Sequence, residues 1–434
     1  MYCGSCMHDN ALARALRARG HDCILLPVYT PIRTDQEDVS EKQLFFGGIN
    51  VFLQQKIPVL GKLPSLLLRG LDAPWLLRLV TRRAASTQPE FLGDLTVSML
   101  RGTKGRQGGE VRRLAHWLAR EFQPDVILLT NLLIGGSIPL LREATGAAVY
   151  VWLQGDDIFL DHLSPRHRQL ATTLMAGLAR ESTGLLVNSH FYAKKMGERL
   201  EVAEDKFCFL PLAIDVDAFA PRPAEHPVHA QGAAGGAQGA SGGTGGEPFK
   251  IGYFARLAKE KGFHLAVDAI LQLAQNVPPG KFEFHYGGWL GEQHQSYFQA
   301  QRERLARSPV AIEHRYRGSP GLAEKGELLR NLDLFSVPTV YEEPKGLFVL
   351  EALASGVPVV QPAHGAFPEL LASTGGGVLV PPLDPAALAD QWQRLMEDPL
   401  RRRELGMAGR NGVLARHTIE AQAAQLEALI TGQS

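Results

Sequence analysis

The residues best suited to chemistry lie in the segment 341–360, YEEPKGLFVLEALASGVPVV, in which the carboxylates of Glu343 and Glu351 stand eight positions apart. Pro344–Gly346 can turn the chain, and Leu347–Ser355 is predicted to be a helix that a glycine ends. Glu343 then precedes the helix, and Glu351 lies just over one turn inside it. The unpaired N–H groups and positive dipole at the start of such a helix attract a diphosphate, and the two carboxylates can accept hydrogen bonds from sugar or ribose hydroxyls.

Cationic side chains stand on one loop in the segment 253–262, YFARLAKEKG. This segment continues a predicted buried strand, Phe249–Phe254, and supplies Arg256 and Lys261. Two positive charges beside the start of a helix would neutralise a departing diphosphate. The alternative for all four charged side chains is ordinary solvated surface. The apolar sequence around the two carboxylates favours the functional interpretation.

The elements that must position these groups alternate between short apolar runs and longer helical stretches, which is typical of parallel strands joined by crossover helices. Near-continuous apolar runs are what strands covered on both faces require. The predicted strands are Cys23–Val28, Asp125–Thr130, Ala147–Leu153, Gly184–Asn188, Phe249–Phe254, Phe282–Tyr286, Asp333–Val337 and Val357–Gln361. The two halves are alike in kind, so we predict two Rossmann-like α/β domains, doubly wound, that face a cleft.

Composition limits the classes of function. A chain of 434 residues suits two domains, and 45% hydrophobic with 21% charged residues is a globular balance. Forty-five basic residues cancel forty-five acidic ones, so no overall field favours nucleic acid. No apolar run approaches the length that spans a bilayer, and four cysteines fit a reducing compartment better than a disulfide framework. We therefore expect a cytoplasmic protein that does not bind nucleic acid.

The beginning of the sequence departs from the doubly wound pattern. Such a domain normally starts with a strand, a glycine-rich turn and a helix, whereas here the turn-like MYCGSCMHDN comes first. We expect that a first strand precedes this sequence; the alternative is a sheet without its usual central strand. Gly4 and Ser5 are predicted to lie in a loop at the cleft. We prefer this loop to a redox or metal site at Cys3 and Cys6, because a metal needs two further ligands at matched spacing.

Domain boundaries follow from QGAAGGAQGASGGTGG, a segment that has no side chains able to form a core. We predict an N-terminal domain at 1–220 and a Gly/Ala-rich linker at 221–248. A C-terminal ligand-binding domain follows at 249–415. The last helical stretch, 416–434, can cross back onto the first domain.

Taken together, these features resemble the group 1 retaining glycosyltransferases. A strand is followed by R-x4-K-G and, well downstream, by E-x7-E on a loop and helix. Further matches are the RGH turn at Arg19–His21, LLVNSHF at Leu185–Phe191 and PLAID at Pro211–Asp215, so that the resemblance covers nearly the whole chain. It implies a GT-B fold and a nucleoside-diphosphate sugar donor held mainly by the second domain. It also implies that the reaction needs no cofactor and no essential metal.

The resemblance further implies roles for individual residues. Arg256 and Lys261 would contact the diphosphate. Glu343 would hold hydroxyls of the donor sugar, and Glu351 those of the ribose. The backbone of Gly346, Leu347 and Phe348 would complete the phosphate cradle. The loop of Arg317, Gly318 and Ser319 would lie near the base.

One position departs from the family pattern. Many members have a histidine that touches the donor sugar, after the strand that here ends VWLQGDD, and Gln154 takes this position. Glutamine donates and accepts hydrogen bonds but carries no charge, so a titrating role there is not expected. The alternative is a glutamine that only caps the next segment. Asp215 and Asp217 form a D-x-D in what resembles the family's hinge, so we expect no metal there.

Residues 51–83 place basic side chains around an apolar helical stripe, which is one signature of binding to a membrane surface. The alternative, which we favour, is a helical lobe packed on the first domain's own sheet. If the membrane interpretation holds, the acceptor is lipid-linked and the protein is peripheral to the inner face of the membrane.

The sequence thus predicts a hexosyltransferase that moves a sugar from a nucleoside-diphosphate sugar to a hydroxyl of a glycan, a lipid-linked molecule or a small molecule. The anomeric configuration is retained. Two alternatives stay open. One is a nucleotide-sugar epimerase of the same fold, which needs added acid–base residues in the cleft. The other is a non-catalytic relative that binds a nucleotide sugar or a partner.

Overall fold

The computed structural model describes most of the chain: residues 4–28, 37–41, 45, 89–220 and 247–432. The segment 51–83, with its apolar stripe and basic side chains, lies outside these residues, and so does nearly all of the linker at 221–248. Both stay predictions. Among the described helices, none is long and apolar enough to cross a membrane.

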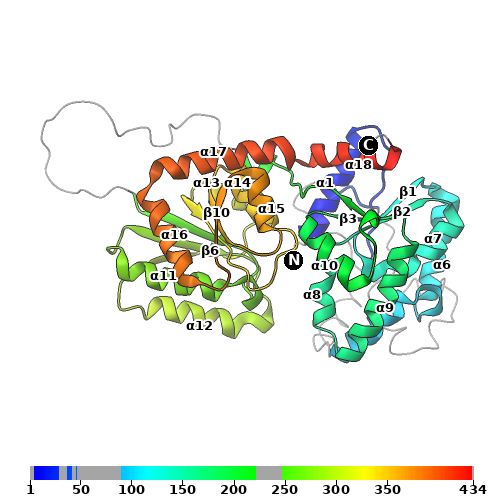
Figure 1. Ribbon diagram of the computed structural model, residues 1–434, viewed down its shortest axis with the longest axis horizontal. Coiled ribbons are helices and arrows are strands. Elements are labelled where there is room, and N and C mark those ends of the chain that lie inside the picture. Colours follow the sequence, from blue (N-terminus) through cyan, green and yellow to red (C-terminus); the bar gives the residue numbers. More distant parts are fainter. Residues whose placement is uncertain (1–3, 29–36, 42–44, 46–88, 221–246, 433–434) are drawn as a thin grey trace, which may run out of the picture. The chain divides into compact units, whose positions relative to one another are not determined.

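The chain divides into two compact α/β units (Figure 1). One comprises Met1–Leu212 and Ile419–Ser434, and the other Ala213–Thr418. The last helix, α18 (Ile419–Thr431), therefore belongs to the first unit, where it packs against α1 (Gly4–Ala18).

A hydrogen-bonded chain fastens α18 to the first unit. The buried His8 of α1 has its Nε2 atom 2.6 Å from Oε1 of Gln422. The amide group of the same glutamine donates to the Pro211 carbonyl oxygen at 2.6 Å. The end of the chain is thus tied both to the first helix and to the segment that leaves the first sheet.

The first unit contains a four-stranded parallel sheet in the order β1-β2-β3-β4. Its strands are β1 (Val126–Leu129), β2 (Ala148–Trp152), β3 (Gly184–Val187) and β4 (Phe207–Phe209). The helices that accompany it are α5 (Pro89–Leu100), α6 (Gly108–Trp117), α7 (Ile138–Thr145), α8 (Asp156–Asp161), α9 (Pro165–Glu181) and α10 (His190–Leu200). The strands pair in parallel because each returns through a helix, as the alternating sequence predicts.

The prediction of a regular strand at Cys23–Val28 is wrong. Within the part of the chain that the structure describes, this segment makes two isolated parallel bridges, Leu25 with Ser40 and Val28 with Phe45. Pro27 lies between the two bridging residues and has no N–H to give to a ladder. The Leu25 carbonyl oxygen accepts from the Glu41 N–H at 2.8 Å and the Pro27 carbonyl oxygen from the Phe45 N–H at 3.4 Å, which is too few bonds for a regular ladder.

The second unit contains a six-stranded parallel sheet in the order β10-β9-β8-β5-β6-β7. Its strands are β5 (Phe249–Phe254), β6 (Phe282–Gly287), β7 (Glu313–Tyr316), β8 (Leu334–Phe335), β9 (Val359–Pro362) and β10 (Gly377–Val380). The order is that of a doubly wound sheet, in which the first half of the chain builds outward in one direction and the second half in the other.

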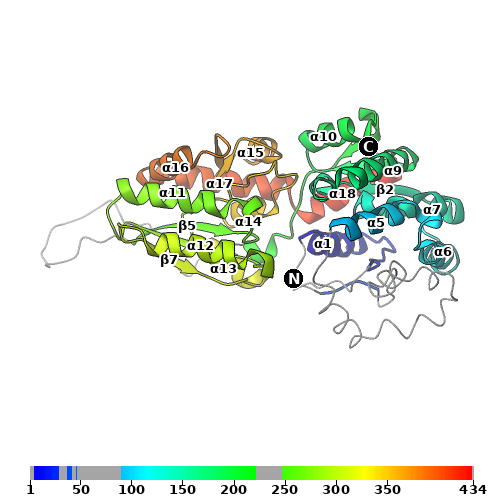
Figure 2. The same ribbon diagram turned by 90° about the horizontal axis from the view of Figure 1, so that it is seen from below.

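Helices cover both faces of this second sheet. They are α11 (Phe263–Asn276), α12 (Gln295–Ala306), α13 (Leu322–Arg330), α14 (Leu347–Ala354), α15 (Phe367–Thr374), α16 (Pro385–Glu397) and α17 (Pro399–Arg416). Figure 1 shows α11 and α12 on one side and α14, α15 and α17 on the other, and Figure 2 gives the view from the α11 side. The ring of Phe263, fully buried, packs against Phe284, Tyr286 and Phe298 and so ties α11 and α12 to the strands.

Candidate active site

The strand order of the second sheet identifies where a ligand binds. The chain reverses its direction of growth between β5 and β8, which are neighbours in the sheet. In open α/β sheets, ligands bind outside the carboxyl ends of the strands at such a switch point. The loops that leave β5 and β8 carry the predicted residues Arg256, Lys261 and Glu343.

The loop after β5 is closed by one buried tyrosine. The hydroxyl of Tyr253 lies 3.2 Å from the Arg256 carbonyl oxygen and 3.1 Å from that of Lys261. Gly262 ends the loop with φ of +72°, and a Cβ atom there would lie 1.7 Å from the Pro338 carbonyl oxygen. The loops after β5 and β8 therefore approach so closely that only glycine fits between them.

Three polar side chains meet where these loops touch. The Lys261 ammonium donates to Oε2 of Glu343 and to the Tyr341 hydroxyl, each at 2.5 Å. The Tyr341 hydroxyl in turn donates to the same Glu343 oxygen at 2.8 Å. The side chains of Lys261 and Glu343 are only 12% and 7% exposed, so water screens their attraction little. We call Lys261, Tyr341 and Glu343 the switch-point triad.

The protonation of the triad follows from its contacts. Burial raises the pKa of Glu343, but the Lys261 ammonium and the hydrogen bonds it receives outweigh burial, so its pKa lies below the ordinary value. Burial, and then the neighbouring Glu343 carboxylate, raise the pKa of Tyr341. The triad thus consists of an ammonium, a carboxylate and a neutral phenol at neutral pH.

The triad sits beside the beginning of α14. The Lys261 ammonium lies 5.0 Å from the ring centre of Tyr341 and 5.2 Å from that of Phe348, in the first turn of this helix. Gly346 precedes the helix with φ of +89°, and its first turn has no acidic side chain and no side-chain cap. The predicted cradle of Gly346, Leu347 and Phe348 therefore places helix N–H groups next to a fixed cation, which together suit an anion.

Glu351 lies one turn further along α14 and has a partner of its own. The ammonium of Lys325, on α13, lies 2.6 Å from both carboxylate oxygens of Glu351. The two side chains are 24% and 12% exposed. Sequence reasoning missed Lys325, since nothing in the spacing of α13 points to α14.

Arg256 is the more exposed of the two predicted cations. Its guanidinium pairs with Glu260 at 3.3 Å, and its side chain is 46% exposed. It is near enough to the triad for its charge to oppose the rise in the pKa of Tyr341. The Glu260 carbonyl oxygen accepts from the Val340 N–H at 2.9 Å, which joins this loop to the one that carries the triad.

The loop Arg317, Gly318 and Ser319 follows β7, at the same edge of the sheet. The Arg317 N–H donates to the Tyr286 carbonyl oxygen at 2.8 Å, and the Gly318 carbonyl oxygen accepts from Gly288 at 2.7 Å. Arg317 also donates a side-chain hydrogen bond to His285 at 3.3 Å. The structure thus brings the predicted loop residues of the second unit to the carboxyl edge of one sheet, while Glu351 lies within α14.

The remaining predicted residues belong to the first unit. Gln154 follows β2; its side-chain amide donates to the Thr130 carbonyl oxygen at 2.9 Å. Its backbone N–H donates to Asp156, a buried carboxyl that also accepts from Leu132 N–H. Burial raises the pKa of Asp156 to about 6. The carboxyl thereby holds together the loops after β1 and β2.

Gly4 and Ser5 do not lie in a loop. They are the first two residues of α1, which begins at Gly4, so the loop expected there is wrong. The helix starts earlier than predicted because the segment contains no proline and continues directly into strong helix formers such as Ala11 and Leu12.

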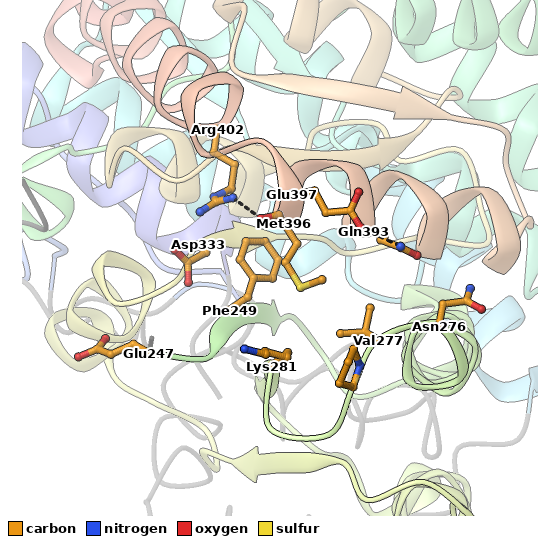
Figure 3. A pocket seen from close by; sticks show the side chains of 11 residues that line it. Glu247, Phe249, Asn276, Val277, Lys281, Asp333, Gln393, Met396, Glu397 and Arg402 are labelled. Atoms are coloured by element: carbon orange, nitrogen blue, oxygen red, sulfur yellow. Dashed lines mark hydrogen bonds between the residues drawn. The ribbon is translucent and has the colours of Figure 1, made fainter. Parts of the chain in front are cut away.

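Among the described residues, no three His, Cys, Asp or Glu side chains gather as they would around a metal ion. One cavity of about 320 Å³ lies elsewhere in the second unit (Figure 3). Phe249, Lys281 and Asp333 line it at the amino ends of β5, β6 and β8. Arg402 lies over the Phe249 ring at 4.9 Å and donates to two carbonyl oxygens of α16. This cavity is therefore at the edge of the sheet opposite to the switch-point triad.

Two α/β units with parallel sheets, the second doubly wound, define the GT-B class of fold, and comparison with known proteins agrees. The chain is similar to an Anabaena HepE structure in complex with UDP (TM-score 0.61, 17% identity, 76% of this chain and 84% of that one). It is also similar to sucrose-phosphate synthase from Thermosynechococcus elongatus (TM-score 0.58, 20% identity, 74% and 77%).

Family models match both units. The model described as "Glycosyl transferases group 1" matches residues 248–398, and that described as "Glycosyl transferase 4-like domain" matches residues 10–213. The chain belongs to the group 1 glycosyltransferases.

Curated relatives resemble the chain over part of their length. WcaL of Escherichia coli (strain K12), a colanic acid biosynthesis glycosyltransferase by name, is 26% identical over 66% of this chain and 66% of its own. The lipopolysaccharide core biosynthesis mannosyltransferase LpsB of Rhizobium meliloti (strain 1021) is 32% identical over 38% of this chain and 45% of its own. The chain thus spans less than two thirds of the length of these relatives.

Proposed function

We propose that the protein is a retaining glycosyltransferase that moves a sugar from a nucleoside-diphosphate sugar to an acceptor hydroxyl. The observation that carries this proposal is the switch-point triad beside the first turn of α14. Family membership supports it, and so do structural relatives solved with UDP and with UDP-glucose.

The charges of the site suit the departure of a diphosphate. As the bond from the anomeric carbon to the phosphate oxygen breaks, negative charge grows on the diphosphate and positive charge on the sugar ring. The Lys261 ammonium and the N–H groups of the first turn of α14 stabilise the negative charge, because they are in place before the reaction begins. Arg256 adds a second cation. The ionised Glu343 accepts hydrogen bonds from the donor sugar and stabilises the positive ring.

The acceptor oxygen forms the new bond on the face that the diphosphate leaves, and its proton passes to the departing phosphate oxygen. One C–O bond breaks and one forms, and no protein nucleophile is needed. We propose that the reaction requires neither a metal ion nor a cofactor. Gln154, held by Thr130, would supply hydrogen bonds but no charge to the donor sugar.

Incubation of the purified protein with UDP-, GDP- and ADP-sugars tests this proposal, with and without EDTA. We expect slow hydrolysis of one donor, a first product with the donor's anomeric configuration by NMR, and no loss of rate in EDTA. Interconversion of nucleotide sugars without release of the nucleotide would point to an epimerase instead. Saturable binding without turnover would point to a non-catalytic relative.

We further propose that the protein is cytoplasmic. If its acceptor is lipid-linked, we propose that residues 51–83 bind peripherally to the inner face of the membrane. The basic apolar stripe in the sequence supports this binding. Sedimentation with vesicles of anionic lipid at low salt tests it: binding supports membrane contact, and protein left in the supernatant refutes it.

A further inference from the structure

A chain of polar side chains runs along β6 and β7 to the carboxyl edge of the second sheet. Glu283 and His285, on β6, are only 8% and 6% exposed. Nε2 of His285 lies 2.8 Å from Oε2 of Glu283, and Nδ1 of His285 lies 3.3 Å from Nη2 of Arg317. Arg315 donates to the other oxygen of Glu283 at 3.0 Å. We call Glu283, His285 and Arg317 the β6–β7 relay.

The relay has one consistent set of protons. Burial lowers the pKa of His285, so its imidazole is neutral and has one donor and one acceptor nitrogen. Burial raises the pKa of Glu283, but hydrogen bonds from His285 and Arg315 outweigh it and lower the pKa overall. Since the Glu283 carboxylate only accepts, Nε2 of His285 carries the proton, and Nδ1 accepts from Arg317. The relay therefore fixes the guanidinium at the edge of the sheet.

The end of the relay at Arg317 is close enough to the predicted diphosphate site for a single nucleotide to contact both. The loops after β5, β6 and β7 are joined by two backbone hydrogen bonds, Ala255 N–H to Gly287 at 3.2 Å and Gly288 N–H to Gly318 at 2.7 Å. Two strand spacings amount to roughly 10 Å, a distance that a ribose and base attached to the diphosphate can bridge. Arg317 immediately precedes the last of these residues.

Arg317 also holds a donor that lacks a partner. Its Nε atom is buried and makes no hydrogen bond to any described residue. An unsatisfied buried donor is unfavourable, and arginine can only donate, so an acceptor brought to this edge of the sheet by a bound ligand would improve the hydrogen bonding of the guanidinium.

We propose, on the basis of the function proposed above, that Arg317, positioned by Glu283 and His285, reads the base of the donor nucleotide. A donor-only guanidinium favours a base whose edge presents a carbonyl oxygen, as guanine and uracil do. It disfavours adenine, which presents an amino group at the corresponding position.

Titration calorimetry with GDP, UDP and ADP tests this inference. We expect the wild-type protein to bind GDP or UDP more tightly than ADP by about tenfold, the scale of one good arginine–base contact. Arg317→Gln and His285→Leu should reduce this preference to within about twofold. His285→Gln should keep it, because glutamine also offers one acceptor and one donor. Arg307→Gln is the control: it removes an exposed cation of the second unit that pairs with Glu303 on α12, and it should leave the preference unchanged.

The outcomes separate this inference from the proposed function. A wild-type protein that binds none of the three diphosphates overturns both. If they bind but Arg317→Gln keeps the wild-type ratio of affinities, or if ADP binds most tightly to the wild type, base reading is overturned and the transferase proposal stands. Should His285→Leu fail to fold, Arg317→Gln, in which the replaced side chain is partly exposed, decides the question alone.

Discussion

Replacement of Lys261 by methionine separates the charge of this side chain from its packing. Methionine keeps most of the volume but removes the ammonium that lies 2.5 Å from Glu343. Both side chains are largely buried, so the substitution leaves a carboxylate in a place that burial makes unfavourable for it. The Tyr341 hydroxyl remains as a hydrogen-bond donor to Glu343.

The expected losses differ for folding and for rate. Removal of one partner of a buried ion pair costs about 3–5 kcal/mol of the free energy of unfolding. Removal of a preorganised donor from a developing oxyanion costs about 2.7–4 kcal/mol of transition-state stabilisation, which is a hundredfold or more in kcat. We therefore expect Lys261→Met to unfold at a lower urea concentration and to turn over at least a hundredfold more slowly.

The double variant Lys261→Met/Glu343→Gln tells these effects apart, with urea denaturation and donor hydrolysis as the assays. It removes both charges, so we expect it to regain much of the lost stability while its rate stays at least a hundredfold low. Arg113→Met is the matched control, because it breaks another largely buried pair, with Glu110 at 2.6 Å, in the first unit. It should lose stability and keep the turnover of its folded fraction.

Wild-type turnover in folded Lys261→Met would refute the assigned role. A double variant that regains its rate together with its stability would show that Lys261 only supports the structure. Either result would show that the Lys261 ammonium does not stabilise the transition state.

Three further outcomes follow from the second unit. Gly262→Ala should lower the urea midpoint strongly, because its Cβ atom would lie 1.7 Å from the Pro338 carbonyl oxygen, whereas Gly280→Ala, at a similar φ of +78° but in open space, should cost about 1 kcal/mol. The pKa of Glu343 in the folded protein lies below its ordinary 4.5, so the stability that this carboxylate contributes is present above pH 4.5 and is lost as the pH falls through the folded pKa. Urea titrations from pH 7 downward should show this loss in the wild type. In Glu343→Gln, the free energy of unfolding should change less with pH. Lys325→Met should raise KM for the donor several-fold with little change in kcat, since the lysine orients a carboxylate on α14 and does not touch the reacting atoms; steady-state kinetics with equal effects on both constants would contradict this.

The sequence predicted the interior strands of both sheets, of which β3, β6 and β9 are buried along their whole length, and also the partly buried edge strand β1. β2 and β6 fall within one residue of the predicted ranges, because a covered strand must be apolar along its length. β7 and β10 were not predicted, and both lie at the edges of the second sheet. β7 reads EHRY and is largely exposed, while β10 begins at the last of three consecutive glycines, so neither carries the pattern of a central strand. The three-residue β4, an edge strand of the first sheet, is too short to show one.

The pairing within the site depends on geometry that sequence spacing does not contain. The approach of Lys261 to Glu343 could be expected, because both loops leave strands that meet at a switch point. The hydrogen bonds of Tyr341 to Lys261 and Glu343 could not be expected, since they depend on how closely Gly262 lets the two loops approach. The contact between Lys325 and Glu351 depends on the packing of α13 against α14 and leaves no trace in either helix alone.

A crystal structure of the protein with a nucleoside diphosphate would test the central claim most directly. The account predicts the terminal phosphate within hydrogen-bonding distance of the Lys261 ammonium and of the N–H groups that begin α14. A diphosphate seated instead at the opposite edge of the sheet, beside Arg402 and Lys281 (Figure 3), would contradict it.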